Sequence, residues 1–255
     1  REKNVESLAK ICDHLDQFLG VAQFVDDSQN GLQVGGKDEV RRVAGMVDAS
    51  VEGFQAAIEA GAGLVIVHHG LFWRQAMRLT DLLYERLKLL MKHDIALYAA
   101  HLPLDAHPEV GNNIQLLELV GAELTGWFAE YGGKPIGCLG RFHRPHPLTT
   151  VIETLDEALQ TQTRVFDFGA ANVSTVGIVS GGACDAIPAA HDAGVDLFIS
   201  GEPRLSAYHE LQEYGLNAAF AGHYATETVG VRALLKRLPG WFDVETMFID
   251  TPTDL

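Results

Sequence analysis

The sequence contains few cysteines, and none of them fits a disulfide framework or a thiolate metal site. Only Cys12, Cys138 and Cys184 occur in 255 residues, an odd number without a Cys-x-x-Cys pair. Because closely paired cysteines mark both structural disulfides of small secreted domains and zinc thiolate sites, this usage disfavours both. It predicts a protein of the reducing cytoplasm.

Positive charge is also scarce. The chain has 19 Lys and Arg against 34 Asp and Glu, which gives a net charge of −15 and a pI near 5.0. Binding to a nucleic-acid backbone depends on a surplus of cations, so nucleic acid is disfavoured as a partner. A small anionic substrate such as a nucleotide is not excluded, because bound metal ions and a few local arginines can make the potential at one site positive despite the negative net charge of the chain.

Several other sequence patterns are missing. No apolar run is long enough to span a bilayer, and residues 1–5 lack the layout of a secretory signal, so we expect no membrane partner. The glycine pairs at 35–36, 132–133 and 181–182 form neither a dinucleotide-binding fingerprint nor a phosphate loop. Ser180 and Ser200 lack the context of a nucleophile elbow. These absences disfavour Rossmann enzymes, nucleoside triphosphatases and serine hydrolases.

Apolar spacing predicts alternating strands and helices, and therefore an α/β fold with mainly parallel sheets. We expect helices over residues 5–19, 51–60 (with Ser50 as N-cap), 82–92, 148–159 and after Gly111, and strands over 42–48, 64–67, 95–100, 136–142 and 164–168. Residues 27–36, with the turn signal Asn30-Gly31, are expected to form a loop or a short hairpin.

The chain also repeats itself. Residues 43–69 align with 176–202, and residues 96–101 align with 218–223. In this register His69 matches Glu202, and the first copy carries a longer loop around residues 72–80. The repeat predicts two related α/β halves, 1–126 and 127–255, with a metal site in the cleft between them.

Three histidine motifs follow apolar runs. His68 and His69 end the run that begins at Leu64, and the spaced pairs His101-x-x-x-Asp105 and His223-x-x-x-Glu227 follow the next such runs of each half. Imidazole and carboxylate are the usual ligands of zinc, iron, manganese and nickel, and ligands of open α/β sheets bind at the carboxyl ends of strands. The motifs therefore predict a metal site, with a metal-free acid–base pocket as the alternative.

The two spaced pairs differ in their expected local structure. A helix that starts near Tyr224 would put His223 and Glu227 on one face. Pro103 argues against a regular helix between His101 and Asp105, which we expect to converge from a turn. His101 is either a ligand or an acid–base group with Asp105 as its partner.

These residues resemble the Nif-three-like family, whose members are often labelled type-two homologs of GTP cyclohydrolase I. The resemblance runs nearly end to end and rests on Asn30-Gly-Leu-Gln33, Val67-His-His-Gly-Leu-Phe-Trp73, the segment His101–Asn113, Ile199-Ser-Gly-Glu202 and Gly222-His-Tyr-Ala-Thr-Glu227. It implies a dinuclear metal centre inside a homohexameric ring, with His101 beside the ions. The ligands it implies are His68, His69, Asp105, His223 and Glu227. The chain looks like the short form of the family, without an inserted domain.

The expected function is that of a cytoplasmic dinuclear metal-dependent hydrolase. Two divalent ions per subunit (Zn, Fe, Mn or Ni) would activate water for attack on a nucleotide such as GTP at purine C8, which opens the ring and releases formate. His101 or Glu202 would move protons. Two alternatives keep the metal site: a two-metal phosphoesterase, and a ring-forming interaction protein without catalysis.

Overall fold

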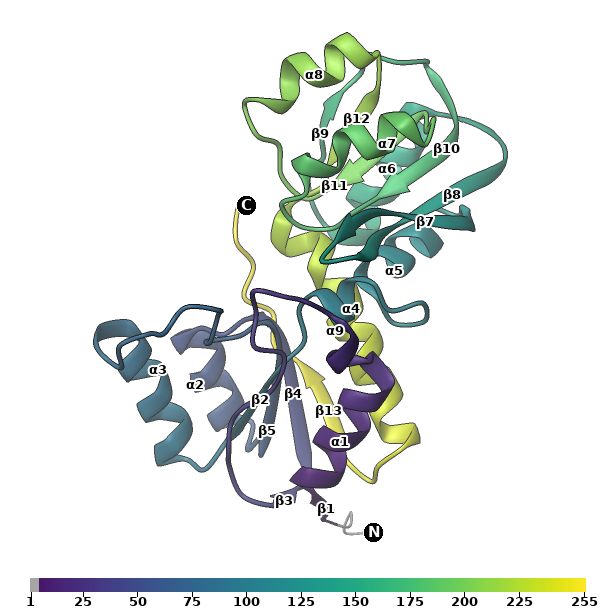
Figure 1. The fold of residues 1–255 in the computed structure, drawn as a ribbon. Helices are drawn as coiled ribbons and strands as arrows, with labels where there is room; N and C mark the ends of the chain where they lie inside the picture. Colours follow the sequence, from purple (N-terminus) through teal and green to yellow (C-terminus); the bar gives the residue numbers. More distant parts are fainter. Residues whose placement is uncertain (1–4) are drawn as a thin grey trace. The chain divides into compact units, whose positions relative to one another are not determined.

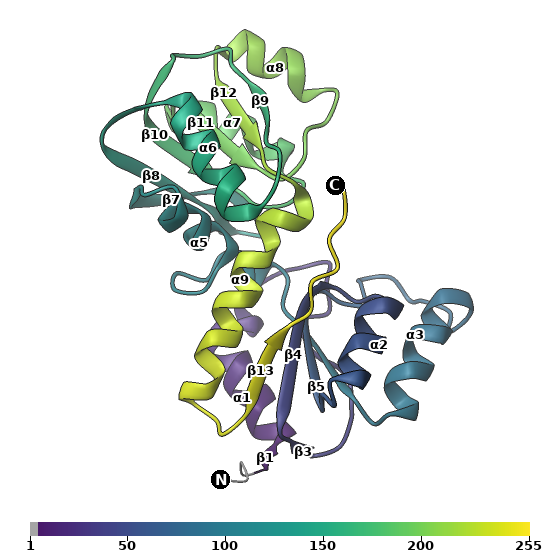
Figure 2. The same cartoon turned by 180° about the vertical axis from the view of Figure 1, so that it is seen from behind.

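The computed structural model describes residues 5–255, which form two compact units (Figures 1 and 2). The first unit contains the chain up to Leu104 and the segment Val231–Thr251; the second contains Asp105–Gly230 and Pro252–Leu255. This division differs from the expected halves 1–126 and 127–255. The reason is long-range strand pairing: β13 (Glu245–Phe248) lies parallel to β4 (Arg42–Asp48), which returns a C-terminal segment to the first unit.

The first unit is built around a five-stranded sheet in the order β13-β4-β5-β6-β2. β5 (Leu64–His69) and β6 (Ala96–Ala99) continue the parallel ladder, and β2 (Gly31–Val34) pairs antiparallel with β6. The helices α2 (Val51–Glu59) and α3 (Asp81–Lys92) cover one face, and α1 (Leu8–Leu19) covers the other (Figure 1). A separate two-stranded sheet pairs β1 (Glu6–Ser7) with β3 (Glu39–Val40).

The second unit has a six-stranded sheet in the order β7-β8-β10-β11-β12-β9. Its three central strands are parallel, and its remaining pairings are antiparallel. The strands are β7 (Glu123–Tyr131), β8 (Lys134–Pro147), β9 (Arg164–Phe166), β10 (Asn172–Ile178), β11 (Leu197–Ser200) and β12 (Asn217–Phe220). The helices are α5 (Asn112–Leu119), α6 (Leu148–Leu159), α7 (Ile187–Asp192) and α8 (Ala207–Tyr214). These findings confirm a mixed α/β fold with parallel strands in both units.

Two helices carry the chain from one unit to the other. The short helix α4 (Leu102–Asp105) contains the boundary after Leu104, and α9 (His223–Arg237) contains the boundary after Gly230. Three further turns of 3₁₀ helix occur at Val21–Gln23, Cys184–Ala186 and Leu238–Gly240. Within residues 5–255, no helix combines the length and the apolarity that crossing a bilayer requires.

Local sequence signals explain how the elements begin and end. The hydroxyl of Ser50 accepts a hydrogen bond from the backbone N–H of Gly53 (3.0 Å), which is the expected N-cap of α2. After this helix Gly61 takes a φ of +70°, where a side chain would be strained. Phe54 and Ala57 lie on the face of α2 that packs against the sheet, and both are fully buried.

The two units repeat one parallel motif. Val43 pairs with Leu64 in the β4–β5 ladder, and Val176 pairs with Leu197 in the β10–β11 ladder, as the sequence register requires. The pairing register of the third strand differs by one residue between the two units. Leu64 pairs with Ala96, but Leu197 pairs with Asn217 and not with the next residue, which matches Ala96 in the repeat. Residues 72–80, where the longer loop was expected, contain no helix or named strand.

Two local expectations were wrong or incomplete, and one strand was missed. Pro103 lies inside the one-turn helix α4, because proline is tolerated in the first turn, where its missing N–H has no helical acceptor. Within the expected loop 27–36 the structure has strand β2. Strand β7 was not predicted; it begins in a segment whose apolar residues do not alternate cleanly, and its pairing with β8 shifts register between Leu124 and Gly126.

Candidate metal centre

Three histidines gather at the carboxyl end of the first unit's parallel strands. His68 and His69 end β5, and His101 follows β6. His68 is fully buried, whereas the side chains of His69 and His101 are each 21% exposed. One nitrogen atom of each ring can serve as a ligand, and these three nitrogen atoms all lie within 4.8 Å of one another. This spacing is short enough for shared coordination of one ion.

A hydrogen bond orients each of these rings through Nδ1. His68 Nδ1 lies 2.9 Å from the carbonyl oxygen of Ala100, His69 Nδ1 lies 2.8 Å from Oδ1 of Asp48, and His101 Nδ1 lies 2.9 Å from Oδ1 of Asp26. These oxygens are acceptors, so Nδ1 carries the proton and the neutral ring keeps its lone pair on Nε2. Metal-ligating histidines are characteristically held in this way.

Asp26 also belongs to this cluster, although no motif in the sequence pointed to it. Besides the ring of His101, it accepts hydrogen bonds from the backbone N–H groups of Ser28 (3.0 Å) and Leu102 (3.0 Å) and from the amide of Asn30 (2.8 Å). Burial opposes its charge, but the hydrogen bond from His101 and those from the other donors lower the pKa of Asp26 to about 2. The acid that orients His101 is therefore Asp26; Asp105, the partner expected from the sequence, accepts other donors.

The segment that follows Asp26 also shapes this end of the first unit. Oδ1 of Asn30 accepts the backbone N–H of His101 (2.7 Å), and Oε1 of Gln33 accepts that of Leu71 (2.7 Å). The indole of Trp73 lies edge-on to the ring of His101, with 5.2 Å between ring centroids. Residues 26–33 thus fix the backbone on both sides of the histidines, which gives the Asn30-Gly-Leu-Gln33 motif a positioning role.

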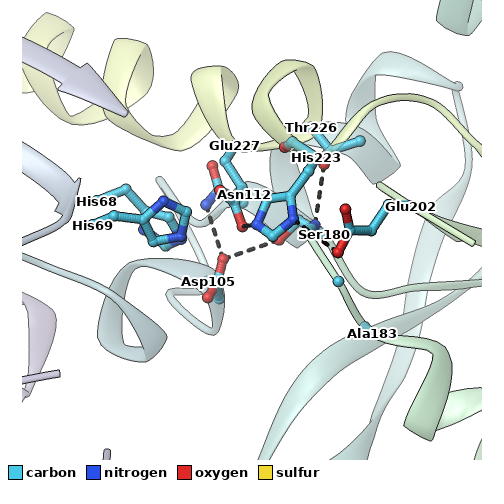
Figure 3. A network of polar contacts seen from close by, with 12 residues as sticks. His68, His69, Asp105, Asn112, Ser180, Ala183, Glu202, His223, Thr226 and Glu227 are labelled. Carbon is cyan, nitrogen blue, oxygen red and sulfur yellow. Dashed lines mark hydrogen bonds and ion pairs between the residues drawn. The ribbon is translucent and has the colours of Figure 1, made fainter. Parts of the chain in front are cut away.

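In the second unit, Asp105 is held by two donors (Figure 3). Its Oδ1 accepts hydrogen bonds from the amide of Asn112 (2.8 Å) and the hydroxyl of Ser180 (2.9 Å). Asn112 is in turn fixed by the backbone N–H of Gly230 on α9 (2.8 Å). All of these side chains are buried, so the carboxylate of Asp105 has a fixed orientation.

Glu227, His223 and Glu202 form a second acidic group in the same unit (Figure 3). Nε2 of His223 lies 3.1 Å from Oε1 of Glu227, one helical turn away on α9, and Nδ1 lies 3.5 Å from Oε1 of Glu202. Burial lowers the pKa of His223, but the hydrogen bond and charge of Glu227, together with Glu202, raise it to about 9. A carboxylate oxygen of Asp105 also lies within 4.8 Å of one of Glu227.

The glycine pair after β10 makes room for this group. Gly181 has a φ of +64°, and a Cβ there would collide with Oε1 of Glu227 and lie 3.0 Å from Nε2 of His223. A Cβ at Gly182 would lie 2.8 Å from Oε1 of Glu202. The pair forms no phosphate loop; instead, the absence of side chains at both positions allows the backbone to lie close to Glu227, His223 and Glu202.

The donor set fits divalent transition metals. The first unit offers neutral imidazole nitrogens in fixed orientation, and the second offers carboxylates beside a further imidazole, the mixture that zinc, iron, manganese and nickel accept. The structure brings together His68, His69 and His101 in one unit, and Asp105, Glu202, His223 and Glu227 in the other. Asp48 and Asp26 add the oxygens that orient two of these histidines.

Comparison with known proteins gives a consistent assignment. The family model Duf34/NIF3 (NGG1p interacting factor 3) matches residues 7–254. A protein of Archaeoglobus fulgidus is 42% identical over 249 residues, covering 98% of this chain and all of the relative, and one of Pyrococcus horikoshii is 44% identical over 247 residues, covering 96% and 98%. Both bear the name GTP cyclohydrolase 1 type 2 homolog.

Solved structures show the same fold. The structural-genomics protein ybgI, of unknown function, has a TM-score of 0.92 at 36% identity, and a protein of Thermus thermophilus has 0.89 at 40% identity. Each likeness covers 98% of this chain and all of the other.

Proposed function

The chain belongs to the Duf34/NIF3 family, and from this premise we propose that it is a dinuclear metal-dependent hydrolase that acts on a nucleotide such as GTP. The observation that carries the proposal is the common orientation of His68, His69 and His101, whose Nδ1 atoms are all held by oxygens. The printed name of the relatives motivates GTP as the first substrate to test.

We propose that the ligands of the two ions are His68, His69, Asp105, His223 and Glu227. Chain connectivity supports grouping them. Asp105 closes the helix that begins directly after His101, and the helix that carries His223 and Glu227 continues without a break into the first unit. The ions would be divalent zinc, iron, manganese or nickel, since mixed nitrogen and oxygen ligands suit each of them.

When bound, such ions supply the Lewis acidity that lowers the pKa of water and makes it a nucleophile near neutral pH. The chain's own residues would then move protons. Asp26 holds Nδ1 of His101, which leaves Nε2 to exchange a proton with the substrate. Glu202, whose side chain is 40% exposed, can exchange a second proton with a ligand. Attack of this water at purine C8 would open the ring to a formamide, and hydrolysis of the formamide by a second water would release formate.

The test combines metal analysis with turnover. Protein purified without chelator is assayed for metal content and then for formate release from GTP with that metal restored. We expect His69→Ala to abolish turnover and His93→Ala, at the end of α3, to retain it. Metal-saturated wild-type protein that releases no formate would refute a GTP cyclohydrolase; release of phosphate from a panel of phosphate esters would assign the site to a two-metal phosphoesterase. A protein without any turnover, in which His69→Ala lowers the melting temperature, would be a metal-organised interaction protein.

We also propose that the protein works as a homohexamer in the cytoplasm. Apolar side chains on α3 support self-association, because Leu82 and Met91 are 69% and 62% exposed. The three thiols are free and buried, which suits a reducing compartment. Light scattering coupled to size-exclusion chromatography would check the assembly, and a measured monomer would contradict it.

A further inference from the structure

We propose that a pocket centred on Arg164, in the second unit, binds a phosphate group of the substrate. Two adjoining hollows meet at Arg164 and Pro203. The smaller one, about 240 Å³, is lined by Arg164, Phe166, Pro203, Arg204, Leu205 and Tyr208. The larger one, about 860 Å³, extends from Arg164 to Glu202 and Gly222. The larger hollow has the volume of a small-molecule site, and the smaller one adjoins it.

Charge favours an anion in the smaller hollow. It contains two guanidinium groups and no carboxylate. Arg204 is already engaged, because its Nη1 lies 2.8 Å from both carboxylate oxygens of Asp185. Arg164, by contrast, has no ion-pair partner within residues 5–255 and lies over the ring of Phe166, 5.2 Å from its centroid. Arg164 is therefore the group available to a ligand.

Aromatic packing holds this arginine in place. Phe166 makes edge-to-face contacts with Tyr208 and Phe220, with centroid distances of 5.4 and 5.6 Å. A guanidinium that rests on such a fixed ring loses less freedom when it binds an anion, and its planar fork can donate two parallel hydrogen bonds to phosphate oxygens. The pocket thus presents an oriented donor, in contrast to an arginine with a freely moving side chain.

The orientation of the bound ligand follows from the carboxylates that line the larger hollow. Glu202 and Asp254 line the larger hollow and would repel an anion there. Glu202 also lies beside His223, at 3.5 Å between carboxylate and Nδ1. A ligand whose phosphate binds Arg164 would therefore extend its uncharged part towards Glu202. The assignment of this phosphate to the substrate, and with it the orientation, rests on the proposed hydrolase function; the binding of a phosphate group at Arg164 does not.

The test measures binding and turnover separately. Titration calorimetry compares GTP with guanosine on the full chain as purified, for wild type, Arg164→Gln and the control Arg144→Gln, an exposed arginine of β8 that lines neither hollow. We expect Arg164→Gln to weaken GTP binding at least about tenfold, to leave guanosine binding unchanged and to keep the wild-type circular dichroism spectrum. Arg144→Gln should bind as the wild type does.

Each result decides one of the two proposals. Equal GTP affinity of Arg164→Gln and wild type, or no GTP binding by wild type, would overturn the pocket. Binding that depends on Arg164 without formate release keeps the pocket and removes the cyclohydrolase. Formate release that is unchanged in Arg164→Gln at low GTP concentration keeps the hydrolase and removes the pocket.

Discussion

Asp48 and His69 stand directly opposite each other at the end of the β4–β5 ladder, and Oδ1 of Asp48 lies 2.8 Å from Nδ1 of His69. The pair is an orienting carboxylate and an imidazole, built on two neighbouring parallel strands. In the second unit the repeat places Gly181 at the position equivalent to Asp48. Because Gly181 has no side chain, the carboxylate of Glu227 can lie against its backbone. At equivalent positions of the repeat, Asp48 thus makes a hydrogen bond to a histidine, whereas Gly181 leaves room for a carboxylate.

The first prediction concerns this orienting contact. Asp48→Ala should weaken metal binding about 10- to 100-fold, the usual effect of losing such a carboxylate behind a histidine ligand. Melting temperature should change little, because the side chain of Asp48 is 42% exposed. Competition with a chromogenic chelator measures the affinity, and Asp13→Ala, on the exposed face of α1, is the matched control. Unchanged affinity in Asp48→Ala would remove Asp48 from the metal centre.

The second prediction concerns Gly181. Gly181→Ala and Gly194→Ala introduce the same group at nearly the same φ, +64° and +68°, but a Cβ at Gly194 meets nothing within 4 Å. Both variants should lose about 1–2 kcal/mol of unfolding free energy from the left-handed conformation. Only Gly181→Ala should lose more than this and also bind metal poorly, because Glu227 and His223 must move. Equal unfolding free energies from urea titrations, with equal metal content, would contradict the role assigned to Gly181.

Much of the fold was predictable because its signals are local. Apolar runs, the Ser50 cap and the glycine stops predict β4, α2 and β5, and the repeat predicts the same ladder register in both units. The histidine motifs were found for the same reason: each follows a buried strand. Assignment of the family, made from these motifs, is confirmed by the family model and the relatives.

What the sequence did not reveal depends on contacts between distant residues. Asp26 and His101 are 75 positions apart, and no local pattern links them. Asp48 could have been found, since it ends a strand predicted to lie beside that of His69. The return of Glu245–Phe248 to the first sheet depends on pairing with a strand some 200 residues earlier, which local periodicity cannot show.

The third prediction separates the two possible roles of His101. We expect His101→Gln to retain the wild-type metal content and to lower kcat by about 100-fold or more, as loss of an acid–base group does. His68→Gln is the comparison, because a ligand should lower metal content as well as turnover. Elemental analysis and formate release measure the two effects. Loss of metal from His101→Gln equal to that from His68→Gln would make His101 a ligand.

The last prediction concerns the pH dependence of the metal-free protein. Burial opposes the charge of His223, but Glu227 and Glu202 raise its pKa from 6.5 to about 9. The protonated ring therefore stabilises the folded state fully below about pH 6.5, and this contribution is lost as pH rises through about 9. In the metal-free protein, His223→Gln should therefore lower the unfolding free energy most near pH 6. The difference in unfolding free energy between this variant and wild type should decrease towards about pH 9.5.

Urea unfolding of chelator-treated protein measures this gap, and Glu227→Gln is the control background. Removing the Glu227 carboxylate takes away the hydrogen bond and charge that stabilise the protonated ring. In that background His223→Gln should lower the unfolding free energy less, and the decrease should depend less on pH, because the ion pair between His223 and Glu227 is already absent. A gap that stays constant with pH in the wild-type background would mean that His223 and Glu227 do not form an ion pair in the metal-free protein.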